Sequence, residues 1–278
     1  MREANNQELL VLEAGRTERH YWRDLWRYRE LLYFLARRDV SVRYKQTVFG
    51  IAWALVRPLA TMLVFTLVFG RLAKLPSEGM PYSLIVLSGM LPWFFFASAL
   101  TDASGSLVAN GNLLSKIYFP RLLFPISTVL VSLVDLAIGL VLLVAMMTVM
   151  GYPPTVRLFS VLVFVLLAFG ISLGLGLWFA AMNVKYRDFR IVVPFLLMVG
   201  LYVSPIGFST NVIPEHWRLL YSLNPMVGVI DGFRWAVLGD AFSPRSGALV
   251  SSVVAMVILL TSGTWYFRRT ERFFADII

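Results

Sequence analysis

Charged side chains stand inside or beside long apolar stretches of this sequence, where they offer chemistry that the surrounding residues lack. Arg57 lies in the apolar run that begins at Phe49, directly before Pro58, and Asp135 lies in a later run. Asp102 stands near the edge of another run. Charges at membrane depth are costly, so they pair with one another or line a path for polar cargo. For Asp135, a functional role and a simple helix–helix hydrogen bond both stay open.

The motifs that carry enzyme chemistry are absent from the sequence. None of the four lysines follows a glycine, so G-x-x-x-x-G-K-[ST] cannot be matched, and neither G-x-S-x-G nor H-E-x-x-H occurs. The chain has no cysteine and only two histidines, His20 and His216, which are far apart in sequence. Thiolate metal sites are therefore excluded, and a histidine metal cluster is not expected. We expect no enzyme activity and no cofactor in this chain.

The composition is strongly apolar. Of the 278 residues, 58% are hydrophobic and 15% are charged. Soluble domains usually contain about 25% charged residues, so this balance predicts a polytopic membrane protein. The net charge of +9 could suggest nucleic-acid binding, but most basic residues flank apolar runs. We expect no signal peptide, because the first 48 residues are highly charged.

Six apolar runs approach the length of about 20 residues that a spanning helix needs. The fifth run is short, and we expect Ser204, Pro205 and Gly207 to break its outer end. The sequence therefore predicts an all-α polytopic membrane protein with six transmembrane helices per subunit. The runs are Phe49–Gly70, Ser83–Leu100, Leu122–Gly151, Leu158–Val184, Ile191–Phe208 and Ala248–Phe267.

The basic residues indicate how these spans are oriented. Six spans place both chain ends on one side, where 18 Lys and Arg residues fall, against six on the other side. Basic residues are enriched in cytoplasmic loops, so we expect both termini in the cytoplasm. Residues 1–48 would form a cytoplasmic N-terminus, residues 49–267 a transmembrane domain, and residues 268–278 a cytoplasmic tail.

The N-terminal segment has the spacing of an amphipathic helix. Apolar or aromatic residues recur at helical intervals, and Trp22 and Trp26 widen the same stripe. With the arginines around it, this pattern predicts a helix along the cytoplasmic membrane surface. A helix that packs on a protein partner is the alternative, and both interpretations can hold. The stripe consists of Tyr21, Leu25, Tyr28, Leu32 and Leu35.

Residues 209–247 form a long connection before the last run. Pro214 and Pro225 each precede a short, partly apolar segment that is too short to cross a bilayer. We expect two short re-entrant extracellular helices that pack back against the bundle and away from lipid.

Several segments, in order along the chain, resemble the ABC-2 type permeases that export O-antigen and capsular polysaccharides. The resemblance covers nearly the whole chain from about Tyr21. One departure is Arg57, where the family leads us to expect an uncharged polar residue such as glutamine. The segments are "RYKQTVFGIAWALVRPLATMLVFTLVFGRLA" (43–73), "GMLPWFFFASAL" (89–100), "NLLSKIYFPRLLFP" (112–125), "VKYRDFRIVVPFLLMVGLYVSPIGFS" (184–209) and "LNPMVGVIDGFRW" (223–235).

The resemblance implies a homodimer in the bacterial inner membrane. Two copies of an ABC ATPase subunit would dock on its cytoplasmic face and bind ATP and Mg²⁺. In such permeases, the connection between spans two and three is a coupling helix seated in a groove of the ATPase. Here that connection is about 110–118, with Leu113, Leu114, Lys116 and Ile117 as the coupling residues.

The resemblance also implies a channel for lipid-linked polysaccharide, enclosed by spans one and five of both subunits. Aromatic faces suit this task, because sugars can stack on them without fixed charges. The expected channel residues are Phe49, Trp53, Arg57, Phe195 and Tyr202. Short extracellular helices would gate the channel, and the expected gate residues are Pro225, Asp231, Arg234 and Trp235.

Two other functions stay open at this point. The first is an exporter of the same architecture with another cargo, such as teichoic acid, lipid or a drug. The second is a membrane-embedded enzyme of glycan or lipid synthesis. The enzyme needs a cluster of acidic or histidine residues at one membrane face, and the sequence shows none.

Overall fold

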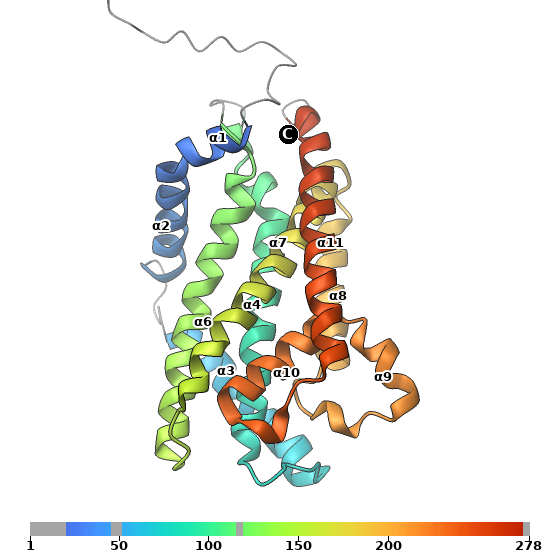
Figure 1. Cartoon of the computed structure of the whole chain (residues 1–278). Helices are drawn as coiled ribbons and strands as arrows, with labels where there is room; N and C mark the ends of the chain where they lie inside the picture. The colour runs from blue at the N-terminus through green and yellow to red at the C-terminus, as the bar shows by residue number, and fades with distance from the viewer. Residues whose placement is uncertain (1–20, 46–51, 115–118, 275–278) are drawn as a thin grey trace, which may run out of the picture.

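The computed structural model describes residues 21–45, 52–114 and 119–274, and these residues form helices and turns without a β-strand (Figure 1). The described fold thus confirms the all-α prediction. The α-helices are α1 (Tyr21–Arg27), α2 (Arg29–Lys45), α3 (Ala52–Phe65), α4 (Tyr82–Ala109), α5 (Gly111–Leu114), α6 (Leu123–Val149), α7 (Val161–Lys185), α8 (Phe189–Val203), α9 (Glu215–Ser222), α10 (Pro225–Leu238) and α11 (Ser246–Thr270). Short π or 3-10 segments are η1 (Thr66–Leu72), η2 (Val156–Ser160), η3 (Thr210–Val212), η4 (Asp240–Phe242) and η5 (Glu271–Phe273).

Five helical segments in the described part of the chain are long and apolar enough to cross a membrane. This observation confirms a polytopic membrane protein. It leaves the fifth predicted span, Ile191–Phe208, as a prediction, because the corresponding α8 has 15 residues. At 1.5 Å per residue α8 is about 22 Å long, shorter than a hydrocarbon core of about 30 Å. The five segments are Ala52–Leu72, Tyr82–Ala109, Leu123–Val149, Val156–Lys185 and Ser246–Phe273.

Helix α8 ends where the sequence predicted a break. Its last residue is Val203, and Ser204 adopts an extended backbone conformation. Residues 204–207, which follow, are buried although they are not helical. Non-helical backbone at membrane depth is tolerated where protein surrounds it. In contrast, α3 continues as a helix through Pro58, whose side chain is buried.

Helix α4 forms the centre of the bundle. Its side chains are buried along most of its length, because α3, α6, α7, α8 and α10 all pack against it. Glycines permit close approach: a Cβ atom added at Gly139 of α6 would lie 2.4 Å from Leu91, and one at Gly176 of α7 would lie 2.7 Å from Ala103. The position of α4 therefore fixes the spacing of the other spans.

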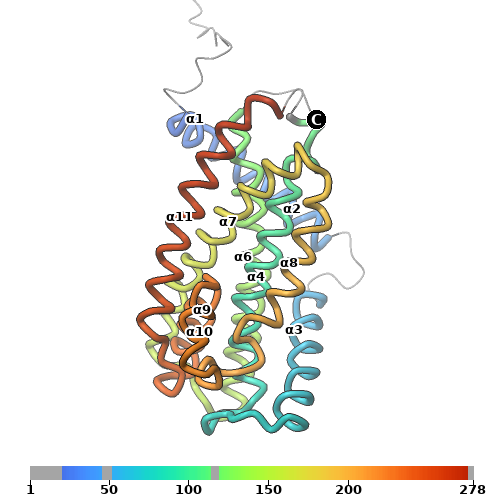
Figure 2. Tube along the Cα trace, turned by 90° about the vertical axis from the view of Figure 1, so that its right-hand side faces the viewer, coloured from blue at the N-terminus to red at the C-terminus, as the bar shows by residue number. Residues whose placement is uncertain are grey.

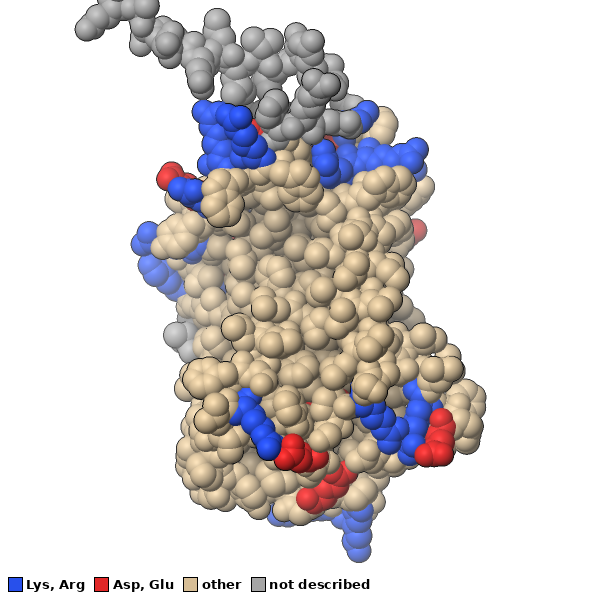
Figure 3. All heavy atoms as spheres, in the orientation of Figure 1, with Lys and Arg blue, Asp and Glu red and all other residues tan. Residues whose placement is uncertain are grey.

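Helix α1 and the end of α11 lie at the same end of the bundle, which we call the α1 end (Figure 1). Helix α10 lies toward the opposite end, which we call the α10 end. Charged side chains gather at both ends and near α2, with an apolar belt between them (Figure 3). This distribution is typical of a protein that spans a bilayer.

The N-terminal helices pack on the bundle. Helix α1 lies across its end, whereas α2 runs beside α6 (Figure 1). Tyr21 and Leu35, from the predicted apolar stripe, are buried in a core cluster at the α1 end. Trp22 and Trp26 are exposed and do not share this face, so the prediction that they widen the stripe is wrong. Each is one residue beyond a stripe position, and one residue turns a helix by about 100°.

Candidate functional site

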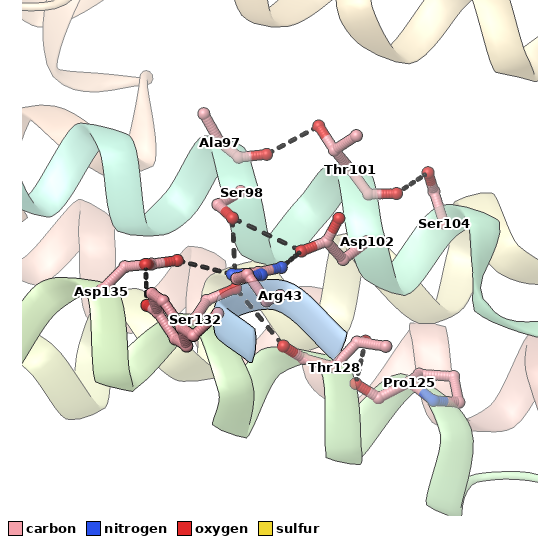
Figure 4. Close-up of polar contacts among 11 residues, drawn as sticks. Arg43, Ala97, Ser98, Thr101, Asp102, Ser104, Pro125, Thr128, Ser132 and Asp135 are labelled. Carbon is pink, nitrogen blue, oxygen red and sulfur yellow. Dashed lines mark hydrogen bonds and ion pairs between the residues drawn. The ribbon is translucent and has the colours of Figure 1, made fainter. Parts of the chain in front are cut away.

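A charged cluster joins α2, α4 and α6. Arg43 lies between Asp102 of α4 and Asp135 of α6 (Figure 4). Its Nη1 donates a 2.5 Å hydrogen bond to Oδ2 of Asp135, and its Nη2 donates to Asp102. The Tyr44 hydroxyl donates to the other Asp135 oxygen. Ser98 adds a 3.4 Å hydrogen bond to Asp102, so one cation and two hydroxyls satisfy both carboxylates.

The Tyr44 phenol is protonated, as its hydrogen bond to the Asp135 carboxylate requires. Burial and the hydrogen bond to Asp135 raise the pKa of Tyr44 above its ordinary value, so the phenol keeps its proton and donates it to the carboxylate. All three charged side chains of the cluster are half-buried. A half-buried carboxylate needs such partners, because an unpaired charge away from water is costly. Asp135 therefore holds α2 against α6.

A cavity of about 310 Å³ opens beside the charged cluster, between α2, α3, α4 and α6. Arg57 lines it, with its Cζ atom 4.8 Å from the centre of the Phe94 ring. A guanidinium group over an aromatic face is a favourable contact. Arg57 thus points across the cavity toward α4. The polar and aromatic lining consists of Arg43, Tyr44, Trp53, Arg57, Phe94, Phe95, Ser98 and Asp135.

Helices α3 and α8 share one side of the bundle, where both pack on α4 (Figure 2). Gly200 lets α8 approach α4, because a Cβ atom there would lie 2.6 Å from Trp93. Three of the predicted channel residues on these helices are more than half exposed: Trp53, Phe195 and Tyr202. Arg57 lies on α3 with Trp53, and Phe49 lies outside the described residues. The structure thus puts the described channel candidates on α3 and α8, which share one side of the bundle, and their role in transport stays a prediction.

Arg234 closes the broken end of α8 from inside the bundle. Its side chain is 1% exposed. Nη2 donates hydrogen bonds to the carbonyl oxygens of Pro205 (2.8 Å), Ile206 (3.2 Å) and Ile85 (3.3 Å), and Nη1 donates to Phe208 (3.2 Å). Carbonyl groups that leave a helix at membrane depth need such donors. One arginine therefore stabilises the non-helical segment that ends α8.

The other predicted gate residues lie along α10. Asp231 is buried, accepts a hydrogen bond from Thr210 and lies 4.0 Å from Arg234. Pro225 is at the N-terminus of α10, where Asn224 caps the helix. Asp231 and Arg234 thus hold residues 209–247 in place from inside the bundle, and the contacts described for them do not identify a gate.

Trp235, the last predicted gate residue, contacts a charged pair near the end of α10. The Trp235 Nε1 atom donates to Asp240 (3.2 Å), which also pairs with Arg157 (2.7 Å). These hydrogen bonds lower the pKa of the exposed Asp240 below its usual value.

Helix α10 is buried against the bundle as predicted. Helix α9 has no buried residue, and its side chains Trp217 and Leu219 are exposed. The prediction that both short helices are buried against the bundle is therefore wrong for α9.

The connection between α4 and α6 contains the predicted coupling residues. Leu113 lies in the four-residue α5 and packs against the core cluster at the α1 end. Leu114 ends α5, and Lys116 and Ile117 lie outside the described residues. Helix α5 thus lies between α4 and α6, and a coupling helix over about 110–118 that contacts an ATPase stays a prediction.

A second polar cluster anchors the residues that follow this connection. The backbone N–H of Arg121 donates a 2.9 Å hydrogen bond to Oε1 of Glu271, and the Tyr21 hydroxyl donates to the same atom over 3.4 Å. The Arg121 guanidinium donates to the backbone oxygen of Glu271. Phe119 packs edge-on against Phe124 with ring centres 5.3 Å apart. Glu271 thus joins α1, the start of α6 and the end of α11.

Sequence reasoning missed Arg43, Tyr44 and Glu271. Arg43 and Tyr44 stand in a strongly basic segment that reads as a surface helix, and Glu271 stands in a charged tail. The available signal was that Asp102 and Asp135 needed a cation, because the nearby apolar runs provide few. Within the described residues, no group of three or more acidic or histidine side chains could hold a metal ion.

Comparisons with known proteins agree with this architecture. The family described as ABC-2 type transporter matches residues 30–238. The chain is 29% identical over 260 residues to the O-antigen export system permease protein RfbA of Myxococcus xanthus, covering 92% of this chain and 98% of that protein. It is 24% identical over 239 residues to the polysialic acid transport protein KpsM of Escherichia coli (84% and 91%). It is 27% identical over 221 residues to the inner membrane transport permease YadH of Escherichia coli strain K12 (75% and 86%).

Proposed function

The chain belongs to the ABC-2 type transporter family, and from that membership we propose that it is the membrane permease subunit of an ATP-driven exporter of lipid-linked polysaccharide. Two of the similar proteins are named for O-antigen export and polysialic acid transport. Both are similar to this chain over more than four fifths of its length. Their shared cargo class supports a polysaccharide of the O-antigen or capsular type.

Exposed aromatic side chains on α3 and α8 are the observation that carries this proposal. Trp53, Phe195 and Tyr202 are exposed there, and Arg57 is the charged residue that the sequence places among them. Aromatic rings stack on the C–H faces of sugars, and weak stacking lets a chain slide. A second copy of the chain would complete the channel, so the permease acts as a homodimer.

An ATPase partner supplies the energy in this proposal. The sequence contains no phosphate-binding loop, so ATP and Mg²⁺ bind to the partner and not to this chain. Two ATPase subunits dock at the α1 end, against the connection around residues 110–118. The anchoring of Arg121 by Glu271 supports this docking, because motion of the connection then reaches both α6 and α11.

The α1 end faces the cytoplasm of a bacterial cell in this proposal. The excess of Lys and Arg at that end supports the orientation. Placement in the inner membrane is supported by the name of the similar YadH protein.

Co-purification with the partner tests the proposed function. The permease is expressed with candidate ATPases and purified in detergent, and we expect one of them to remain bound and to hydrolyse ATP. Leu113→Asp with Ile117→Asp should abolish this association and stop export, because two carboxylates would enter an apolar contact. Leu219→Asp, on exposed α9, is the control and should change neither. Normal export by the Leu113/Ile117 variant would exclude a coupling role for the connection.

A further inference from the structure

A groove of about 460 Å³ lies at the α1 end, between the last turns of α7 and α11. It is separate from the charged cluster and from the cavity beside Arg57. Its floor is apolar and its rim carries two cations. The residues that line it are Ala181, Val184, Lys185, Tyr266, Arg269, Thr270, Phe273 and Phe274.

The two cations at the rim are Lys185 and Arg269. Lys185 Nζ lies 5.0 Å from the centre of the Tyr186 ring, and Arg269 Cζ lies 5.4 Å from the centre of the Trp265 ring. Within the described part of the chain neither of them forms an ion pair, and no acidic residue lines the groove. The rim therefore has two positive charges that no carboxylate among the described residues balances, which favours an anionic ligand.

The floor is suited to a hydrocarbon chain. Ala181, Val184 and Phe274 are buried, and Phe273 is an exposed aromatic wall. Tyr266 stacks on Trp178 with ring centres 4.2 Å apart and an interplanar angle of 14°, which fixes the opposite wall. A ligand that fits both rim and floor has an anionic head and an apolar tail.

The groove also lies at the depth where such a ligand is found. Helix α7 has 25 residues, about 37 Å at 1.5 Å per residue, so its last turn reaches the edge of a hydrocarbon core of about 30 Å. Lys185 is the last residue of that helix. Basic pockets between spanning helices at the cytoplasmic boundary are typical sites for anionic lipid head groups.

We propose that this groove binds an anionic phospholipid. The lipid phosphate lies between Lys185 and Arg269, and an acyl chain covers Val184 and Phe273. The proposal rests on the proposed orientation, with the α1 end in the cytoplasm, and it does not depend on the cargo. One side of the groove is formed by α11, which lies across the bundle from α3 (Figure 2). A phospholipid there does not compete with cargo at the exposed residues of α3.

Bound lipid would act on the second polar cluster. One wall of the groove is the turn that carries Thr270 and Phe273, and this turn contains Glu271, which holds Arg121. A phospholipid that packs on this turn stabilises the link between the end of α11 and the start of α6. The lipid site therefore connects membrane composition to the segment that follows the α4–α6 connection.

Native mass spectrometry of the delipidated full-length protein tests the proposal. The probes are dioleoyl phosphatidylglycerol, dioleoyl phosphatidylcholine and glycerol phosphate, each titrated in the same detergent. We expect phosphatidylglycerol to bind at least about tenfold more tightly than phosphatidylcholine, because each cation near an anionic lipid adds attraction. Glycerol phosphate should not displace the bound lipid. If it does so at similar concentration, the site binds a free phosphate group and the lipid proposal is wrong.

Two double variants separate this groove from general surface charge. Lys185→Gln with Arg269→Gln should weaken phosphatidylglycerol binding about tenfold or more. Arg187→Gln with Arg190→Gln removes the same charge from exposed residues just beyond α7 and should leave binding within about twofold of the original. Equal losses in the two variants, or no loss in the first, would overturn the proposal. Lys185→Arg with Arg269→Lys should retain tight binding, which shows that the charges and not the fold are responsible.

Discussion

The Nη1 atom of Arg43 lies 2.5 Å from Oδ2 of Asp135, so the last turn of α2 is joined to the middle of α6. The same guanidinium group binds Asp102 of α4. Only six residues, 46–51, separate α2 from α3. The ion pair therefore also restrains where the first span begins, and with it the position of Trp53 and Arg57.

Removal of this cation should destabilise the protein. Arg43→Gln leaves two half-buried carboxylates without a positive partner, so we expect the free energy of unfolding to fall by about 1–3 kcal/mol. Thermal or denaturant unfolding of the purified protein in detergent measures the loss. Arg37→Gln, on an exposed position of the same helix, should change it by less than about 0.5 kcal/mol.

A double reversal tests the pairing itself. Arg43→Asp alone places three carboxylates together, and Asp135→Arg added to it returns a cation to the cluster. We expect the double variant to recover part of the stability lost in the single variant. If Arg43→Gln unfolds at the same temperature as Arg37→Gln, the ion pair does not hold α2 in place.

Glu271 should contribute to stability at the α1 end. Glu271→Ala removes the acceptor for the Arg121 N–H and the Tyr21 hydroxyl, and we expect a loss of about 1–3 kcal/mol. Glu271→Gln retains an acceptor oxygen and should lose less. Glu215→Ala is the control, because Glu215 pairs with Arg218 on its own helix. Unfolding measurements that find Glu271→Ala and Glu215→Ala equal would contradict the anchoring role.

Arg57 should affect transport more than folding. Its guanidinium group faces the cavity over Phe94, so Arg57→Gln removes a donor from the proposed path and leaves the packing of α3 intact. We expect export to fall by about tenfold, the effect of losing one charge-assisted hydrogen bond. Surface polysaccharide is measured after a pulse of expression, at equal protein level. Arg71→Gln, at the other end of the same span, is the control, and equal export by the two variants would exclude Arg57 from the path.

Local features of the sequence predicted the helices well. Hydropathy acts over about 20 neighbouring residues, so the apolar runs located most of the spans within a few positions, although α4 continues to Ala109, well past the predicted end at Leu100. The break after Val203 was also predictable, because Ser204 and Pro205 favour an extended backbone. Local pattern could not predict which group satisfies the carbonyls after this break, because Arg234 lies 28 or 29 residues further along the chain.

The partners of the charged residues could not be predicted. Arg43 and Asp135 are 92 residues apart, and Tyr21 and Glu271 are 250 residues apart. Such contacts depend on how each helix is rotated and how α4 spaces its neighbours, and a single sequence does not determine these. Arg234 shows the same limit: the family resemblance implied a gate residue, and its contacts are the carbonyl groups at the end of α8.

Gly89 provides the sharpest test of how Arg234 is held. A Cβ atom at Gly89 would lie 2.5 Å from Nη2 of Arg234 and 3.1 Å from the carbonyl oxygen of Ile206. Gly89→Ala should therefore push the guanidinium group off the Pro205 and Ile206 carbonyls and lower the free energy of unfolding by about 1–3 kcal/mol.

Gly105 lies on the same helix, and a Cβ atom there has nothing within 4 Å. Gly105→Ala should be neutral or stabilise by up to about 1 kcal/mol, since alanine favours the helix. Arg234→Met separates the two possible effects of Gly89→Ala, because a change that acts through Arg234 adds little once Arg234 is gone. If Gly89→Ala destabilises the Arg234→Met variant as much as it destabilises the unmodified protein, α4 and not Arg234 requires the glycine.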